Sequence, residues 1–264
     1  MATKTWIGTT ADVTTGANWS PTGQPTAGDD VIITGSQSID GATLSASGNL
    51  ASFVIRDYTG TIGSATSDLV VDVAASGNVA IDTTGVSYID FNASDTNVTV
   101  YGTASASGGS YGLQVKGSSL NNIYQYAGSV RLASGTLDAN WYTYSSSASV
   151  RIDDAAGVVD FVGFGPAEIY GSATDVYTNG ATVEYYNMAG GLTVAQAEAG
   201  GVIEYYSDEN IATANAWGGT IDGSKNPHTL TVAATSVRDG GTIKPGDNWT
   251  LTANPSESYQ ITSA

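Results

Sequence analysis

Short apolar runs rich in Val and Ile recur along the chain, and turn residues bound each of them. Examples are Asp30–Thr34, Leu69–Val73 and Asn97–Tyr101. Runs of this length, separated by Gly, Ser, Asn and Asp, are typical of β-strands joined by tight turns. One Ala-rich stretch, Thr193–Ala199, has the composition of a helix, and glycine pairs close it at both ends. The pattern therefore predicts an all-β fold.

The second half of the chain repeats one short motif, in which Val or Ile follows a small or β-branched residue and precedes a charged one. The central apolar residues of this motif are Val130, Val150, Val183, Ile203, Ile221 and Ile243. Their separations are 20, 33, 20, 18 and 22 residues, and Ile169 falls inside the long interval. The repeat is therefore about 20 residues long.

A repeat of about 20 residues indicates one coil of a parallel β-helix, in which short strands and tight bends complete a rung. Rungs stack at the inter-strand distance of roughly 4.8 Å, so residues one repeat apart lie above one another. We expect Val183 to lie against Ile203, and Tyr185–Tyr186 to stack on Tyr205–Tyr206. The predicted fold is a single-stranded parallel β-helix, or solenoid, with rungs of about 20 residues and capped ends.

The alternative fold is an antiparallel β-sandwich or jelly roll. Such a fold requires two-residue hairpin signals between consecutive strands. Asn-Gly and Asp-Gly pairs stand at 40–41, 179–180, 222–223 and 239–240, but they are scattered rather than placed as hairpins. The solenoid is therefore favoured.

The repeat divides the chain into three expected parts: an N-terminal cap or arm at 1–29, a β-solenoid at 30–253 and a C-terminal tail at 254–264. An open solenoid end exposes core and unpaired strand edges, so it needs a cap. Trp6 and Trp19 are large enough to cover the first rung. Trp249, Pro255 and the tail could close the last rung or reach a partner.

The charge balance narrows the range of partners. Eight Lys and Arg stand against 25 Asp and Glu, which gives a net charge of −17. Such a chain repels nucleic acid and anionic membranes. No apolar run approaches the length of a membrane span, and Met1–Trp6 is not followed by the apolar stretch of a secretion signal. We expect neither a nucleic-acid nor a membrane partner, and synthesis without a standard secretion signal.

Residues that could carry catalysis are few. Cys is absent and His228 is the single histidine, which excludes a Cys-His pair and the usual zinc sites. Glu184 and Glu204 are expected one rung apart and could form the carboxylate pair of a glycosidase. The same point of the repeat also carries charges of either sign, which favours a solvent-exposed row; these residues are Arg131, Arg151, Asp222 and Lys244.

Acidic turns give no stronger signal. Asp153-Asp154 beside Arg151 is a weak approach to the acidic groove of pectin-cleaving β-helices. Asp29-Asp30 and Asp208–Asn210 could each hold one ion, yet a plain polar bend explains them as well, and no EF-hand spacing occurs. We therefore expect no enzyme activity, and no catalytic, cofactor-binding or metal-binding residue.

Aromatic residues are the better candidates for binding. Exposed aromatic rings can stack on sugars, and Tyr and Trp also dominate the cores of protein interfaces. The candidate partner or sugar contacts are Trp6, Trp19, Trp141, Tyr142, Tyr144, Tyr185, Tyr186, Tyr205 and Tyr206. The sequence does not separate the two uses.

The first 35 residues carry a resemblance. Trp-Ile-Gly within Lys4–Gly8, Ala-Asn-Trp within Gly16–Pro21 and the Gly-Asp-Asp that opens Gly28–Ile33 resemble the start of small acidic β-helical structural proteins of bacteriophage particles. They are also similar to the start of β-helical repeats in bacterial adhesins. The rest of the chain resembles these families only in its composition.

The resemblance implies a virion protein made in the host cytoplasm. It would act without catalysis as a capsid decoration, or cement, protein that stabilises a phage head. The partner would be the major capsid protein or another virion protein, and the chain would form a homotrimer. The alternative is a carbohydrate-binding or carbohydrate-cleaving β-helix of a tail spike, a tail fibre or a cell-surface adhesin.

Overall fold

The computed structural model describes residues 1–44, 49–92, 96–104 and 111–252, and these residues form a parallel β-solenoid. The chain divides into two compact units. The first unit comprises Met1–Ala139 with Ser147–Ser149, and the second comprises Asn140–Ser146 with Val150–Ala264. The expected solenoid is therefore confirmed. The tail expected at 254–264, with Pro255, lies outside the described residues.

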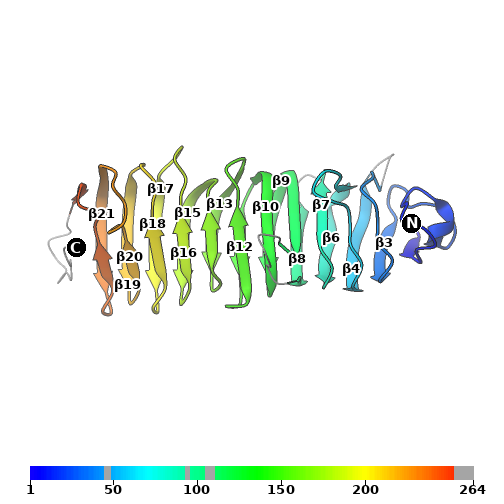
Figure 1. Ribbon diagram of the computed structural model, residues 1–264, viewed down its shortest axis with the longest axis horizontal. Coiled ribbons are helices and arrows are strands. Elements are labelled where there is room, and N and C mark those ends of the chain that lie inside the picture. The colour runs from blue at the N-terminus through cyan, green and yellow to red at the C-terminus, as the bar shows by residue number, and fades with distance from the viewer. Residues whose placement is uncertain (45–48, 93–95, 105–110, 253–264) are drawn as a thin grey trace. The chain divides into compact units, whose positions relative to one another are not determined.

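The first unit begins with a short 3-10 turn and two short strands, and continues with longer ones (Figure 1). Its elements are β1 (Thr3–Trp6), η1 (Gly16–Asn18), β2 (Trp19–Ser20), β3 (Asp30–Gly35), β4 (Leu50–Tyr58), β5 (Leu69–Val71), β6 (Val73–Thr83), β7 (Ser87–Phe91), β8 (Thr96–Gly102), β9 (Leu113–Gln125) and β10 (Gly128–Leu137).

Two parallel ladders run through the first unit. One ladder joins β1, β3, β4, β6, β8 and the second half of β9. The other joins β5, β7, the first half of β9 and β10. Parallel neighbours cannot be joined by a hairpin turn, so the chain runs through the other ladder before it returns to pair with itself. This route is the coil of a solenoid.

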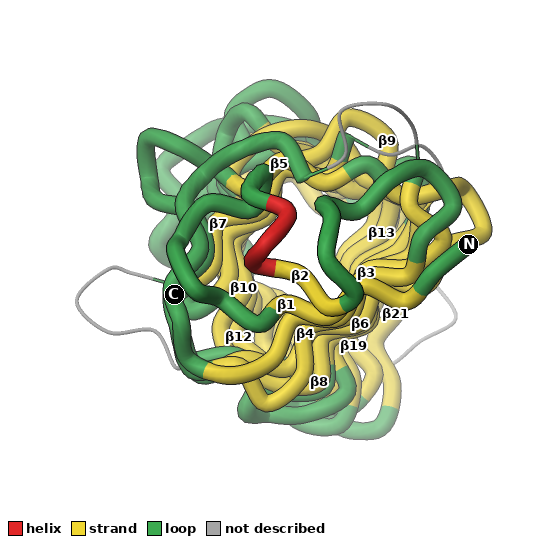
Figure 2. The backbone as a smooth tube through the Cα atoms, turned by 90° about the vertical axis from the view of Figure 1, so that its right-hand side faces the viewer, coloured by secondary structure: helices red, strands yellow, loops and turns green. Residues whose placement is uncertain are grey.

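The start of the first unit closes its own strand edge. β1 pairs in parallel with β3 and antiparallel with β2, so one edge of β1 is used by the next rung and the other by its own chain (Figure 2). The rings of Trp6 and Trp19 meet edge to face at 5.1 Å, and both are buried. The indole Nε1 of Trp19 donates to the carbonyl of Val13. Both tryptophans therefore lie inside this end.

Asn18, the last residue of η1, ties the first loop together. Its side chain is fully buried, its Oδ1 accepts the backbone N–H groups of Thr9 and Thr10 at 2.9 Å, and its Nδ2 donates to the carbonyl of Asp12 at 2.7 Å. Each bond satisfies a loop group that has no strand partner.

The second unit contributes two strands to each rung. Its strands are β11 (Asn140–Thr143), β12 (Ala148–Ile152, which enters this unit at Val150), β13 (Ala156–Gly163), β14 (Ala167–Ile169), β15 (Ser172–Asn179), β16 (Thr182–Tyr185), β17 (Leu192–Glu198), β18 (Val202–Tyr205), β19 (Ile211–Trp217), β20 (Thr220–Asp222), β21 (Leu230–Arg238), β22 (Thr242–Lys244) and β23 (Trp249–Leu251).

Even- and odd-numbered strands of the second unit form separate parallel ladders. The even ladder runs β12, β14, β16, β18, β20, β22, and the odd ladder runs β11, β13, β15, β17, β19, β21, β23. Figure 1 shows β16, β18 and β20 side by side in this order. Each rung therefore presents one outward position to each of two faces.

The register of the even ladder confirms most of the expected repeat and corrects one position. Val183 pairs with Ile203, Ile203 with Ile221 and Ile221 with Ile243, as expected. In the long interval, however, it is Ala167 that aligns with Val150 and Val183, while Ile169 aligns with Tyr185 two residues further on. The small side chain of Ala167 hides this register in the sequence.

Alternate residues of each strand point into the coil. In β16 and β18, Val183, Tyr185, Ile203 and Tyr205 are fully buried. The rings of Tyr185 and Tyr205 stack at 5.3 Å, and Trp249 meets Tyr205 edge-on at 5.8 Å. The stretch 193–199, which has a helical composition, lies almost entirely in β17 because its Ala195 and Ala197 fill the interior of a narrow coil.

Candidate binding surfaces

A row of charged side chains follows the outward face of the even ladder in the second unit. One charged residue stands at the same point of six successive rungs: Arg151, Glu168, Glu184, Glu204, Asp222 and Lys244. We call this set the charged row. Its four central members are acidic and its two end members are basic, so the negative charge is concentrated in the middle.

Three tyrosines form a second row beside the charged row, two residues further along each strand. The rings of Tyr170, Tyr186 and Tyr206 stack in parallel at 4.7 Å between neighbours. We call them the tyrosine row. The guanidinium of Arg151 covers the free face of Tyr170 at 4.3 Å. Because one ring covers the next, the row presents ring edges and hydroxyls to solvent rather than ring faces.

Hydrogen bonds join the two rows. The hydroxyl of Tyr186 donates to Oε2 of Glu184, and the hydroxyl of Tyr206 donates to Oε2 of Glu204. Bonding to Glu184, followed by burial, raises the pKa of Tyr186 well above its usual value, and bonding to Glu204 raises that of Tyr206 in the same way. A carboxylate that accepts a hydrogen bond favours the neutral phenol.

Cations close the charged row. Arg151 donates from Nε to Asp153 at 2.7 Å and from Nη1 to Glu168 at 3.0 Å. At the other end, Lys244 bonds Asp222 at 3.1 Å and Lys225 lies 3.4 Å from Glu204. All these pairs are partly exposed to solvent, so each contributes at most about 1 kcal/mol to folding. Their effect is to hold the side chains in one arrangement.

Five of the nine aromatic candidates are buried, which corrects the expectation that they could reach a sugar or a partner. Trp6, Trp19, Trp141, Tyr185 and Tyr205 each expose 2% or less of their surface in the single chain. Buried rings pack the interior and cannot stack on an external ligand. Strand alternation separates these residues from their outward neighbours, because residue 185 faces inward and residue 186 outward.

The other four candidates are at least partly exposed. Tyr186 and Tyr206 belong to the tyrosine row described above. The rings of Tyr142 and Tyr144 stack on each other at 6.3 Å, and Tyr144 is exposed. In the first unit, Tyr101 and Tyr126 stack in the same manner at 5.6 Å, and both are exposed.

Glu184 and Glu204 do lie on neighbouring rungs, as the sequence predicts. Each accepts a hydrogen bond from the tyrosine two residues later in its own rung. A glycosidase needs one carboxyl group as a proton donor and one as a carboxylate, which requires two different environments. The repeat instead gives these two glutamates equivalent surroundings, and their geometry suggests no division of roles.

The acidic turns singled out in the sequence act as structural ties. Asp29 is buried, and its Oδ1 accepts the backbone N–H of Ala2 at 2.7 Å while its Oδ2 accepts the N–H and hydroxyl of Thr26. The bond from Ala2 is the largest of several that lower the pKa of Asp29. His228 donates its backbone N–H to the Asn226 side chain in a turn. No group of three or more potential metal ligands exists among the described residues.

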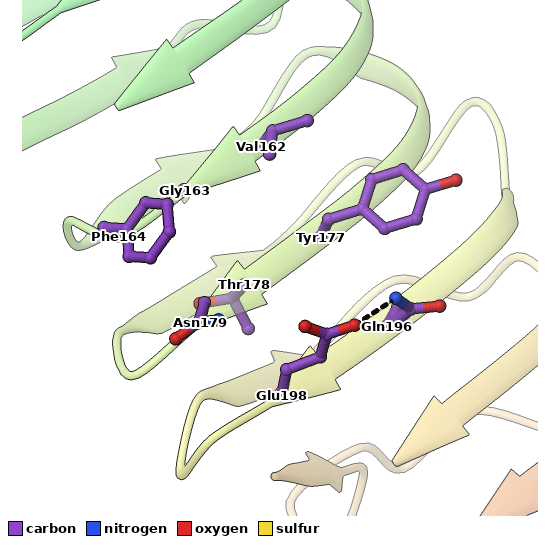
Figure 3. A pocket seen from close by; sticks show the side chains of 8 residues that line it. All are labelled: Val162, Gly163, Phe164, Tyr177, Thr178, Asn179, Gln196 and Glu198. Carbon is purple, nitrogen blue, oxygen red and sulfur yellow. Dashed lines mark hydrogen bonds between the residues drawn. The ribbon is translucent and has the colours of Figure 1, made fainter. Parts of the chain in front are cut away.

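One hollow lies on the odd ladder, and the sequence gave no indication of it. It has a volume of about 340 Å³ and is lined by Val162, Gly163, Phe164, Tyr177, Thr178, Asn179, Gln196 and Glu198. We call it the three-rung hollow, because β13, β15 and β17 each supply part of the wall. Figure 3 shows Phe164, Asn179 and Glu198 in one line across these rungs, with Val162, Tyr177 and Gln196 in a second line.

Register explains how the three-rung hollow is built. Val162 pairs with Tyr177 and Tyr177 with Gln196, and Asn179 pairs with Glu198. Phe164 follows Gly163, whose partner is Thr178, and therefore stands beside Asn179. Gly163 and Thr178 are 15 residues apart, while Thr178 and Ala197 are 19 apart. This uneven spacing conceals the alignment in the sequence.

The first unit has one partly buried charge cluster. Nζ of Lys116 bonds Asp68 at 2.6 Å and stands in register with Asp90. Burial, followed by the charge of Asp68, raises the pKa of Asp90, whereas the charge of Lys116 lowers it. One lysine thus balances two carboxylates in this cluster.

Comparisons with known proteins do not place the chain in a family. The described residues contain no helix long and apolar enough to cross a bilayer. Protein-family models, curated proteins and solved structures were each compared with the chain, and none of them matches it.

Proposed function

We propose that this chain is a non-enzymatic structural protein that acts through protein–protein contacts, as a decoration protein on a phage head. The observation that carries the proposal is the pre-ordered face of the second unit. The charged row and the tyrosine row place side chains at fixed intervals and hold them there by stacking and hydrogen bonds. A surface that is already ordered loses little side-chain entropy when a partner binds.

The charge of this face indicates the chemistry of the partner. Four consecutive rungs carry a carboxylate, and the chain as a whole has a net charge of −17. Complementary charge steers association and fixes register between two surfaces. The partner surface should therefore carry a row of Lys or Arg side chains, with the major capsid protein as the proposed partner. We further propose that the chain binds it as a homotrimer.

The tyrosine row gives the carbohydrate alternative little support. A sugar stacks on the face of an aromatic ring, and both faces of Tyr186 are covered by Tyr170 and Tyr206. Any carbohydrate function of a tail spike, fibre or adhesin would therefore rest on other residues.

Two measurements test the proposal. Light scattering coupled to size exclusion should give three times the monomer mass, either alone or after mixing with purified phage heads. The chain should also sediment with these heads, and the double variant Glu184→Lys, Glu204→Lys should not. The pair Glu198→Lys, Asp239→Lys adds equal charge away from the charged row and is the matched control. Failure of the unmodified chain to sediment with the heads, or equal binding of both double variants, would contradict the proposal.

A further inference from the structure

We propose that the three-rung hollow binds a neutral saccharide. This inference does not depend on the proposed shell contact, because the hollow lies on the odd ladder and the charged row on the even one. Its lining combines the two features that a sugar needs. These are an aromatic ring for the apolar C–H face of a pyranose and polar groups for the hydroxyls around its rim.

Phe164 supplies the aromatic surface. Its side chain is 44% exposed although the residue is fully apolar. Its backbone is fixed, since its N–H donates to Oγ1 of Thr143 at 2.9 Å. In contrast to the tyrosine row, no ring stacking covers Phe164 within the described part of the chain. The exposed ring is therefore available to a ligand.

A chain of hydrogen bonds positions the polar groups. Asn215 donates to Oε1 of Gln196 at 3.0 Å, and Gln196 in turn donates to Oε1 of Glu198 at 2.6 Å (Figure 3). This leaves Oε2 of Glu198 and the side-chain amide of Asn179 without a hydrogen-bond partner among the described residues. The carboxylate accepts hydroxyl protons, and the amide both donates and accepts.

The second wall is also held in place. The hydroxyl of Tyr177 donates to Asp175 at 3.2 Å, and Asp175 accepts the backbone N–H of Val194 at 2.9 Å. The Tyr177 ring is therefore fixed before any ligand arrives. A pre-ordered wall reduces the entropy lost on binding.

Size and charge narrow the ligand to a class. A volume of about 340 Å³ is at the lower end for small-molecule sites, and three rungs span roughly 10 Å, enough for one or two sugar rings. Glu198 and the net charge of −17 repel anionic sugars. Neutral hexoses and N-acetylhexosamines remain.

Calorimetric titration tests the proposal with three probes: maltotriose, cellotriose and the trisaccharide of N-acetylglucosamine. We expect saturable binding of at least one of them. Phe164→Ala should raise its Kd by about tenfold or more, which corresponds to the loss of one stacking contact. Glu198→Ala should weaken binding similarly. Tyr101→Ala, which removes an exposed ring in the first unit, is the matched control and should leave the Kd unchanged.

Three results would overturn the proposal. The first is no heat of binding for any probe at about 10 mM sugar, a weaker interaction than a specific site should show. The second is binding that neither variant changes. The third is stronger binding of lysine amide than of any sugar, which would assign the hollow to cations. Sedimentation of Phe164→Ala with phage heads should be normal, so failure of either proposal is distinguishable from failure of the other.

Discussion

At the scale of single residues, the hydroxyl of Tyr186 shows how one atom links the two rows. It donates to Glu184 while its ring stacks between two other tyrosines. The bond requires the neutral phenol, and the raised pKa of Tyr186 expresses this requirement. The stability that it contributes should therefore depend on pH at the alkaline end.

We predict the pH dependence of Tyr186→Phe. A pKa raised on folding gives stability that is complete below the unfolded value, about 10 for tyrosine, and is lost as pH rises toward the folded value. The variant should thus be less stable than the unmodified chain between pH 6 and 9, and the difference should shrink above pH 10. Urea unfolding at several pH values measures it. Tyr101→Phe, outside the tyrosine row, is the control, and a difference that grows above pH 10 would contradict the argument.

Residue identity alone predicted part of the candidate surfaces. The stacking of residues 185 and 186 on residues 205 and 206 is confirmed by register and ring geometry. The sequence interpretation treated each tyrosine pair as one unit, although strand alternation buries Tyr185 and exposes Tyr186. The signal was present, since buried Val183 and acidic Glu184 already fix the direction of the following two side chains.

At the scale of elements, the coil depends on bends where two backbones come very close. Gly135 in β10 pairs with Gly117 in β9 and has a φ of +93°. A Cβ atom at this position would lie 1.7 Å from the carbonyl oxygen of Gly117. Gly35 has nearly the same φ, +90°, yet no atom lies within 4 Å of the corresponding position. The two glycines separate backbone strain from steric overlap.

We predict that Gly35→Ala and Gly135→Ala differ in cost. The first change carries only the strain of a left-handed backbone and should lower the free energy of unfolding by about 1 kcal/mol. The second also forces two strands apart and should cost about 3 kcal/mol or more. Chemical denaturation of both variants measures the difference. Equal costs would show that β9 and β10 can separate without penalty.

Rung length set the limit of the sequence prediction at this scale. The spacing along the even ladder varies from 16 residues between Ala167 and Val183 to 22 between Ile221 and Ile243. Bends of different length absorb the variation without changing the strand register. A fixed period of 20 therefore found the fold and the rungs of equal length, but missed Ala167 and the alignment of Phe164 with Asn179 and Glu198.

At the scale of the whole molecule, unbalanced negative charge acts against compactness. The chain has 25 acidic and eight basic side chains, and folding stacks carboxylates of the charged row on successive rungs. Like charges at inter-strand distance repel, and salt screens this repulsion over roughly 10 Å at 0.1 M. The folded state should accordingly gain more from added salt than the expanded unfolded chain.

We predict that the melting temperature rises by several degrees between about 10 mM and 500 mM sodium chloride, since screening removes self-repulsion of the folded chain. Glu184→Gln removes one charge from the centre of the charged row and should reduce this rise. The matched variant Glu198→Gln removes a charge from the other ladder and should reduce it less. Calorimetry at several salt concentrations measures all three chains. A melting temperature that falls with salt would show that the ion pairs outweigh the repulsion.

The parallel register of the second unit also makes it a ruler. Every outward position recurs once per rung, at roughly 4.8 Å, so the charged row is graduated in equal steps from Arg151 to Lys244. Removing or duplicating one whole rung would shorten or lengthen this scale by one step and leave every other mark in place. A partner that reads several marks at once would then fit only one length, and rung number becomes a means of selecting it.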